Sequence, residues 1–168
     1  MQKGKERQLL RQMGEYLVAS ELGRRGILAT TFSGNIPVFD IIATGSKGKF
    51  IPIQVKTIKA GCWQFKMDDF VNISFRGKIQ FADGKKKVPI KNLIYVLVLK
   101  GKEYGKDEFY ILEWKSLQDI LVTRYKKGEK GTAEIKRPRN PESTHNTLQP
   151  RLLKSHKDKW STISKLLK

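Results

Sequence analysis

The sequence predicts an α/β fold in which a mixed central β-sheet is preceded by one helix and flanked by others. Apolar residues recur at three- and four-residue spacings near the N-terminus, and several short β-rich segments follow. The 168 residues are 39% hydrophobic, which is enough for one core and argues against wholesale disorder. We expect one domain over residues 1–124, with a basic extension over residues 125–168 that packs on it or extends it.

The first expected element is a helix over residues 6–25. Its apolar positions fall on one side of a helix: Leu9, Leu10, Met13, Leu17, Val18 and Leu22. Gly26 comes next, and glycine is the residue that most often ends a helix because it adopts positive φ without strain. The pattern therefore predicts an amphipathic helix that leads into the sheet.

Strands are expected next, at residues 27–32, 38–44 and 50–58, with residues 45–48 short enough to join the last two as a hairpin. Further strands are expected at residues 60–65, 71–75, 93–100 and 108–114, with a basic turn at residues 83–87 and a short helix over residues 116–121. The apolar residues 93–99 suit either a buried strand or a dimer interface. Trp63, Trp114 and Trp160 are expected to anchor the core or such an interface.

The C-terminal third is strongly basic. Residues 115–168 hold fourteen Lys and Arg against five Asp and Glu, which is half of the net charge of +18. Gly and Pro punctuate residues 125–150, which predicts an extended arm, and residues 152–167 have the apolar spacing of a final helix. We expect DNA contacts from this region and from the basic turn: Lys85, Lys86, Lys87, Arg137, Arg139, Arg151, Lys154, Lys157 and Lys159.

Charge and composition indicate the class of partner. A sequence pI near 10.1 gives a field that attracts polyanions, and nucleic acid is the natural one. No apolar run is long enough to cross a membrane, and residues 1–11 lack the apolar core of a signal peptide. Cys62 is the single cysteine, which fits a reducing cytoplasm and excludes a thiolate zinc cluster. His145 and His156 stand apart, which argues against a histidine metal site.

The residues that carry chemistry are Asp40, Gln54 and Lys56. Gln54 and Lys56 share one side of the third expected strand, and the hairpin brings Asp40 alongside on its neighbour. A divalent cation held by oxygen ligands can activate water and neutralise charge on a phosphodiester. A nearby lysine can hold the phosphate or help orient and deprotonate the water. These three residues therefore predict metal-assisted cleavage of nucleic acid.

The order helix, strand, Asp, hairpin and Gln-x-Lys resembles the core of the PD-(D/E)XK nuclease superfamily. More narrowly, five short motifs over residues 7–58 resemble the archaeal Holliday-junction-resolvase-like branch and related bacterial endonucleases: Gly14-Glu15, Gly26-Ile27, Ser33-Gly34, Asp40-Ile41 and Gln54-Val55-Lys56. The resemblance implies a restriction-endonuclease-like core and Mg²⁺ or Mn²⁺ as cofactor, with no small-molecule cofactor. It also implies a DNA substrate, including branched or otherwise structured DNA, and a homodimer.

The resemblance also implies a metal site. Asp40 would be the metal-binding carboxylate, and Gln54 would contribute its amide oxygen where the family usually has Asp or Glu. The backbone carbonyl of Val55 would be a further ligand. Glu15 would complete the metal shell directly or through water. Glu21 lies nearer the middle of the apolar stripe of the helix, so only the resemblance selects Glu15.

Two further residues receive roles from the same resemblance. Lys56 would be the catalytic lysine, and Ser33 would lie near the scissile phosphate, although Ser-Gly-Asn is also ordinary turn chemistry. Phe39 stands where a proline often precedes the aspartate, a frequent departure within the superfamily.

The sequence leaves other functions open. Because the neutral amide of Gln54 binds Mg²⁺ more weakly than a carboxylate does, the main alternative to an endodeoxyribonuclease is a noncatalytic nucleic-acid-binding module with a degenerate nuclease fold. An RNA-directed protein is a third hypothesis, since charge does not separate DNA from RNA.

Overall fold

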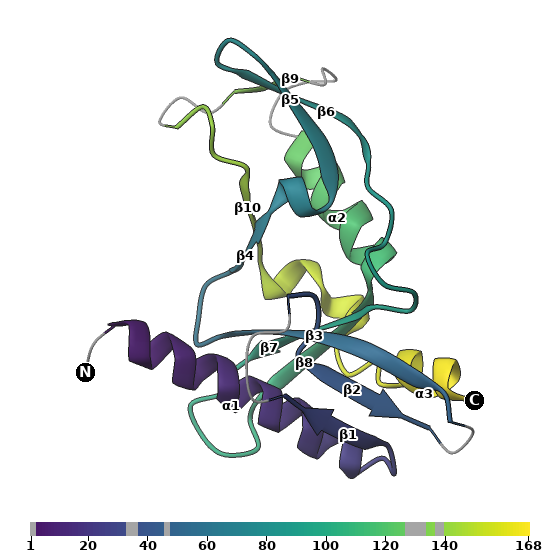
Figure 1. Ribbon diagram of the computed structural model, residues 1–168. Coiled ribbons are helices and arrows are strands. Elements are labelled where there is room, and N and C mark those ends of the chain that lie inside the picture. Colours follow the sequence, from purple (N-terminus) through teal and green to yellow (C-terminus); the bar gives the residue numbers. More distant parts are fainter. Residues whose placement is uncertain (1–2, 33–36, 46–47, 127–133, 137–139) are drawn as a thin grey trace. The chain divides into compact units, whose positions relative to one another are not determined.

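The computed structural model describes residues 3–32, 37–45, 48–126, 134–136 and 140–168 (Figure 1). The chain forms two compact units. Unit 1 comprises residues 1–63, 89–114 and 149–168, and unit 2 comprises residues 64–88 and 115–148. This division differs from the boundary expected after residue 124, because the last twenty residues return to unit 1.

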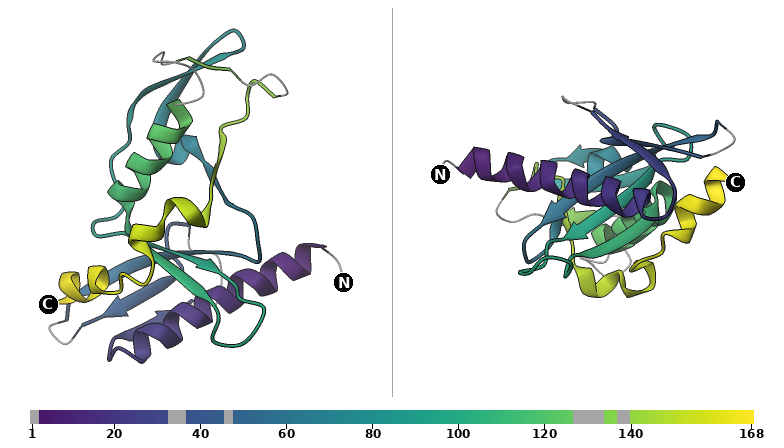
Figure 2. Two further views of the ribbon diagram at one scale, coloured as in Figure 1. Left: turned by 180° about the vertical axis from the view of Figure 1, so that it is seen from behind. Right: turned by 90° about the horizontal axis from the view of Figure 1, so that it is seen from below.

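Unit 1 is built on a five-stranded mixed sheet (Figures 1 and 2). Its strands, in spatial order, are β1 (Leu28–Thr31), β2 (Ile41–Thr44), β3 (Phe50–Ile58), β7 (Ile94–Leu99) and β8 (Glu108–Glu113). All neighbours are antiparallel except β3 and β7, which run parallel. The α/β class and the mixed central sheet that the sequence predicts are confirmed.

One face of this sheet packs against α1 (Lys3–Gly23) and α3 (Ser161–Leu167). Alternate strand residues enter a single buried cluster, in which Val55 and Val96 of the sheet meet Val18 of α1 and Ile163 of α3. In the right panel of Figure 2, α1 crosses the sheet on this side. Gln54 has the opposite parity in β3, so its side chain points away from both helices.

Gly26 ends the first helix as the sequence predicts. Its φ is +71°, and the N–H groups of Gly26 and Ile27 donate to the carbonyls of Gly23 and Leu22 at 2.9 and 3.0 Å. This pair of hydrogen bonds is the Schellman motif, which satisfies carbonyls that the helix leaves unpaired. The helix itself lies slightly earlier than expected, over Lys3–Gly23 instead of residues 6–25.

Unit 2 combines one helix with two small sheets. The helix is α2 (Trp114–Lys126), of which all but Trp114 belongs to this unit. One sheet contains β5 (Val71–Arg76), β6 (Ile79–Lys85) and β9 (Glu134–Lys136), and the other pairs β4 (Trp63–Lys66) with β10 (His145–Leu148). A 3-10 turn, η1 (Met67–Asp69), follows β4.

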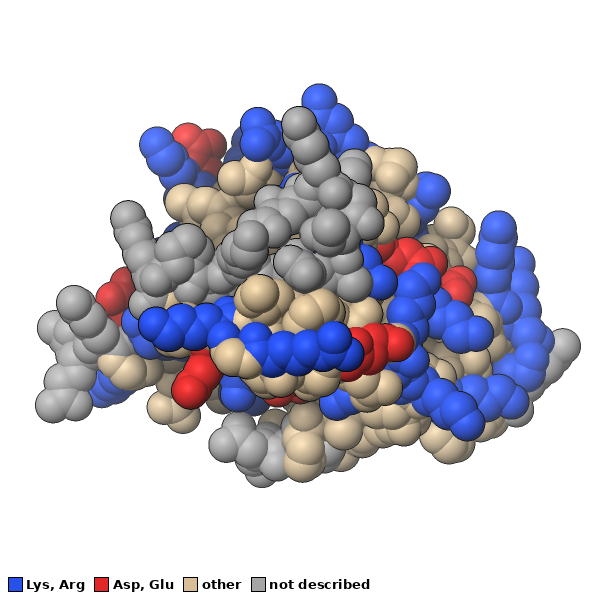
Figure 3. Space-filling model, turned by 90° about the horizontal axis from the view of Figure 1, so that it is seen from above, with Lys and Arg blue, Asp and Glu red and all other residues tan. Residues whose placement is uncertain are grey.

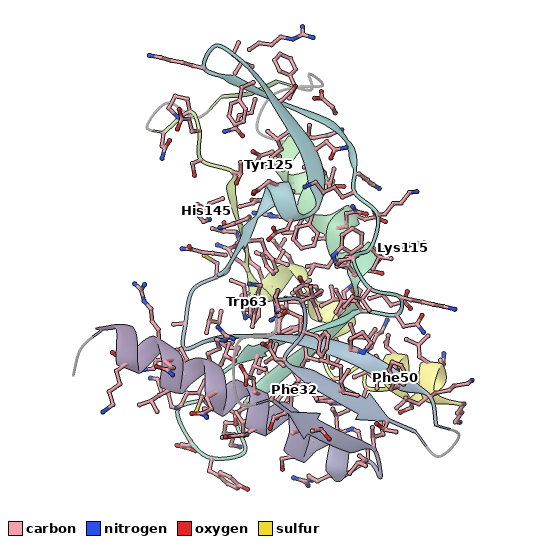
Figure 4. All side chains as sticks on the ribbon, in the orientation of Figure 1. Phe32, Phe50, Trp63, Lys115, Tyr125 and His145 are labelled. Atoms are coloured by element: carbon pink, nitrogen blue, oxygen red, sulfur yellow. The ribbon has the colours of Figure 1, made fainter. Side chains whose placement is uncertain are left out.

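Buried glutamines fix α2 against the strands of unit 2. Gln118 donates from its amide to the carbonyls of Phe70 and Lys86 at 2.6 and 2.9 Å. Gln80 of β6 accepts a hydrogen bond from the hydroxyl of Tyr125, which Figure 4 labels, and donates to the carbonyl of Ser143 at 3.0 Å. Since buried polar groups are costly unless paired, these contacts specify how the helix and strands of this unit meet.

Two predictions around the middle of the chain were wrong. Residues 83–85 continue β6 instead of forming a turn, because Gly84 and Lys85 pair with Asn72 and Val71 of β5. A register shift between Asn72 and Ile73 leaves Asp83 as the extra residue of a bulge. The helix expected over residues 116–121 is longer, at Trp114–Lys126.

The continuous helix predicted over residues 152–167 was also wrong. Two 3-10 turns, η2 (Pro150–Leu152) and η3 (Lys154–His156), precede α3. Asp158 has a φ of +53°, its N–H donates to the carbonyl of Phe109 at 2.8 Å, and Lys157 forms a bridge with Tyr110 of β8. Hydrogen bonds to the sheet thus replace helical ones. The expected arm over residues 125–150 contains β9 and β10, and its residues 127–133 and 137–139 lie outside the described part.

The segment at residues 93–99 is a core strand. Val96, Leu97 and Val98 are fully buried between β3 and β8, which excludes this segment as an exposed dimer interface. The three tryptophans are buried as well, as expected of core residues. Among the described residues, no helix combines the length and apolar character needed to span a membrane.

Candidate functional site

Asp40 and Gln54 lie side by side where β2 and β3 begin to pair. Asp40 directly precedes β2, and its N–H donates to the carbonyl of Ile53 at 2.8 Å, which aligns it with Gln54. The amide of Gln54 donates to Oδ2 of Asp40, and the N–H of Val55 donates to the same oxygen at 2.8 Å. The carboxylate is therefore held in place from two directions and is only 5% exposed.

Lys56 leaves β3 on the same side as Gln54, two residues further on. Its positive charge is one of the influences that lower the pKa of Asp40. The indole N–H of Trp63 donates to the carbonyl of Lys56 at 2.9 Å, and its ring packs against Tyr110 with centroids 5.6 Å apart (Figure 4). Trp63 therefore supports the backbone that carries the lysine.

Glu15 reaches the site from α1 through an arginine. Nε of Arg11 lies 3.4 Å from Oε1 of Glu15, and Nη2 of Arg11 lies 3.5 Å from Oδ1 of Asp40. One guanidinium thus bridges the two carboxylates. Arg11 was missed by sequence reasoning, although its spacing of four residues from Glu15 is typical of an ion pair on a helix.

The other glutamate considered on the helix serves a structural role. Glu21 accepts from Nη1 of Arg25 at 2.5 Å and lies 3.6 Å from Nη1 of Arg24. Its ion pairs belong to the C-terminal end of α1, whereas Glu15 interacts with the Asp40 group. Of these two glutamates, Glu15 is therefore the one joined to Asp40, through Arg11.

Both carboxyl groups have raised pKa values. Burial raises the pKa of Asp40, against the lowering influence of the Val55 N–H and of Arg11. Burial also raises the pKa of Glu15. The negative charge of Asp40 raises this pKa further, and Arg11 lowers it. Two buried carboxylates that repel each other favour a cation between them, and perturbed groups of this kind concentrate at functional sites.

The oxygen donors fit Mg²⁺ or Mn²⁺. Carboxylates and amide or backbone carbonyls are the hard ligands that these ions prefer. Asp40 and Gln54 are in contact, and Nε2 of Gln54 lies 3.5 Å from the carbonyl oxygen of Val55. The charge of Asp40 also raises the pKa of Glu15. Among the described residues, no group of three or more His, Cys, Asp or Glu could hold a metal. A site here would therefore depend on two carboxylates and on the amide oxygen of Gln54, which would have to turn towards the ion because the amide nitrogen faces Asp40.

The residues expected to contact DNA are only partly described. Ser33, Arg137 and Arg139 lie outside the described residues. The remaining lysines and arginine are exposed: Lys85, Lys86, Lys87, Arg151, Lys154, Lys157 and Lys159. Two of them have acidic partners, since Lys85 lies 2.5 Å from Asp119 and Lys157 lies 3.1 Å from Glu108. Acidic side chains therefore partly balance the charges of Lys85 and Lys157.

Comparison with known proteins identifies a solved structure with a similar fold. No protein-family model matches the chain, and no curated protein matches it in sequence. Its structure is similar to that of a bacterial homing endonuclease, I-Ssp6803I, with a TM-score of 0.50 and 13% identity over 94% of this chain and 93% of that one. The chain has a nuclease-like fold. Because the match extends over nearly the whole length, it includes both units.

Proposed function

We propose that this protein is a metal-dependent endodeoxyribonuclease of the PD-(D/E)XK type, close to the resolvase-like branch and with Gln-x-Lys in its third strand. The observation that carries the proposal is the half-buried contact between Asp40 and Gln54, with Arg11 joining Glu15 to the same aspartate and Lys56 on the Gln54 side of β3. The nuclease-like fold supports it.

Each residue of the site has a physical role in such a reaction. Asp40, Gln54 and Glu15 would hold Mg²⁺ or Mn²⁺, which when bound activates water and offsets charge on the phosphate. Lys56 places a positive charge beside this group, where it binds the scissile phosphate or orients the attacking water. The Val55 N–H keeps the Asp40 carboxylate fixed, while Arg11 would leave and the Gln54 amide would turn to admit the ion.

DNA is the proposed substrate. The net charge of +18 favours a long polyanion, and neutralising each phosphate contributes to a strongly salt-dependent affinity. The structural neighbour is a homing endonuclease, which favours DNA over RNA. Two sites can address two strands, so we also propose that the protein acts as a homodimer. Branched DNA remains part of the proposed substrate range through the resemblance to resolvases.

The second candidate function is a noncatalytic DNA-binding module. The specific observation in its favour is that residue 54 is Gln, which lowers the charge of the donor set and with it the affinity for Mg²⁺. Such a module would bind DNA in a salt-sensitive manner without metal-dependent cleavage.

The test is cleavage of labelled four-way-junction, linear duplex, single-stranded DNA and structured RNA with Mg²⁺ or Mn²⁺, with EDTA controls. Wild type is compared with Lys56→Ala and with Lys49→Ala, an exposed lysine just before the same strand. We expect Lys56→Ala to abolish cleavage with binding nearly intact, and Lys49→Ala to cut normally. Equal activity of Lys56→Ala and wild type would refute the site, and binding without cuts on any substrate would establish the noncatalytic module.

A further inference from the structure

The β5–β6 hairpin of unit 2 has one face that its own unit does not cover. The side chains of β5 that point outward are exposed and able to form hydrogen bonds: Asn72, Ser74 and Arg76. Of the residues of the other parity, Val71 of β5 and Gln80 of β6 are buried, whereas Phe75 near the loop is 46% exposed. The hydrogen bond between Gln80 and Tyr125 shows that this buried side faces α2, which lies behind the hairpin in Figure 1.

The register places two apolar side chains among these polar ones. Phe81 pairs with Ser74, and Ile79 pairs with Arg76, so all lie on the outward face. The guanidinium of Arg76 lies over the ring of Phe81, 4.9 Å from its centroid. This cation–π contact orients the arginine without neutralising it, and no acidic side chain of the described residues forms an ion pair with it.

The end of the hairpin is narrow and basic. Residue 76 pairs with residue 79, so Gly77 and Lys78 alone form the loop, and the φ of +59° at Gly77 suits a tight type II′ turn. Lys78 is exposed at this end. The sheet has three strands at this end, because β9 pairs with residues 79–81 of β6, and β5 is its outer strand. An outer strand with a narrow loop can enter the major groove of B-DNA, which is about 12 Å wide.

The charge of unit 2 is complementary to DNA. Its residues include fourteen Lys and Arg against seven Asp and Glu. Figure 3, which views the molecule from above, shows more basic than acidic side chains on the described surface. The outward residues of β5 carry one charge, that of Arg76. A positive surface around such a strand is the arrangement in which phosphate contacts position a protein and base contacts specify the sequence.

We propose that the outward face of the β5–β6 hairpin enters the major groove of double-stranded DNA and reads base edges there. Arg76 suits the two acceptors of guanine, Asn72 suits the acceptor and donor of adenine, and Ile79 and Phe81 suit the thymine methyl group. Lys78 at the loop contacts phosphate. The inference rests on the proposed function in taking DNA as the partner, and it makes the enzyme sequence-selective through unit 2.

The geometry sets the spacing of the bases that are read. Residues 72 and 76 are four positions apart on one strand, or roughly 13.6 Å at about 3.4 Å per residue. Stacked bases on one DNA strand rise by about 3.4 Å each, so a β-strand that follows the groove brings these two side chains to positions about four base pairs apart.

The experiment selects duplexes from a randomised library by binding to the full-length protein in EDTA, so no cleavage is required. We expect wild type to recover a consensus sequence. Arg76→Ala should lose the preference at one guanine position by about 5- to 150-fold, and Asn72→Ala should lose an adenine preference about four base pairs away. Both positions are exposed, and a thermal melt of each variant confirms that it is folded.

Lys102→Ala serves as the matched control, because Lys102 is an exposed lysine of unit 1 outside the hairpin. It should bind every sequence somewhat more weakly and recover the same consensus as wild type. A wild type without any consensus, or an Arg76→Ala variant with an unchanged one, overturns the inference. Cleavage without an Arg76-dependent consensus would refute this inference alone, whereas an Arg76-dependent consensus without cleavage would refute only the proposed catalysis.

Discussion

A β-carbon built on Gly14 lies 1.7 Å from Oγ1 of Thr57, so helix α1 and strand β3 approach more closely here than a side chain at residue 14 allows. Gly14 directly precedes Glu15, and Thr57 directly follows Lys56. The contact therefore sets the distance between the helix that supplies a site carboxylate and the strand that supplies the lysine. Oγ1 of Thr57 is buried and has no hydrogen-bond partner within the described residues.

Gly14→Ala should destabilise the protein by about 1–3 kcal/mol, because the added methyl group forces α1 away from β3. The same shift moves Glu15 relative to Asp40, so cleavage should fall as well. Chemical denaturation measures the first effect. Gly4→Ala is the control on the same helix: no atom lies within 4 Å of its added carbon, and helix propensity should make it neutral or stabilising by up to about 1 kcal/mol.

The double variant Gly14→Ala/Thr57→Ala tests the contact directly. Removing the hydroxyl relieves the shortest approach but leaves Cβ of Thr57 at 2.9 Å, so it should recover only part of the lost stability. Strict additivity of the two single substitutions would show that residues 14 and 57 do not interact.

Arg11→Ala should strengthen the binding of Mn²⁺ about three- to tenfold. A divalent cation must displace the guanidinium that bridges Glu15 and Asp40, and partly exposed ion pairs of this kind each contribute modestly. Calorimetric titration with Mn²⁺ measures the change. Arg7→Ala, one turn earlier on the exposed side of α1, should leave the affinity unchanged. Weaker binding to Arg11→Ala than to wild type would show that Arg11 does not compete with the metal.

Gln54→Glu should bind Mn²⁺ roughly tenfold more tightly, since a carboxylate replaces an amide among the ligands. Without metal the same variant should be less stable than wild type, because two carboxylates then face each other where the Gln54 amide donates to Asp40. Calorimetry and denaturation in EDTA measure the two effects. If both quantities match those of wild type, Gln54 is not a ligand.

The regular parts of the fold were predictable because local patterns and tertiary packing agree there. β3 lies at the predicted residues 50–58, and Gly26 closes the helix in the predicted way. The local sequence pattern fails to predict secondary structure where hydrogen bonds to distant segments determine it. Residues 152–167 contain neither Gly nor Pro. The carbonyl of Phe109 nevertheless accepts a hydrogen bond from the N–H of Asp158, which interrupts the helix.

The site divides in the same way. The proximity of Asp40 and Gln54, with Lys56 on the same side of β3, could be predicted, because strand parity and a short hairpin are enough to produce it. The roles of Gly14 and Arg11 could not, since both depend on how α1 docks on the sheet. Nothing in the sequence around Gly14 indicates that Thr57 lies against it. The pairing of β5 with β6 was missed because the residues around the bulge at Asp83 have the composition of a turn, and a turn was predicted there.

Stability in EDTA should fall as the pH rises from the ordinary carboxyl range through the raised pKa values of Asp40 and Glu15. Burial is the main cause of both raised values. In this window the folded protein binds more protons than the unfolded chain, so each rise in pH favours unfolding. Above the raised values the loss is complete. Glu15→Gln should therefore be more stable than wild type at about pH 8 and similar to it below about pH 4.

A divalent cation should reverse this pH dependence. Mn²⁺ binds the ionised carboxylates of the folded state, so the stabilisation it provides grows as Asp40 and Glu15 lose their protons. Thermal unfolding at several pH values, with EDTA or with Mn²⁺, measures both effects. Glu103→Gln, an exposed glutamate outside the site, controls for the general change in charge. A stability difference between Glu15→Gln and wild type that is the same at every pH would mean that Glu15 is not a buried, titrating member of the site.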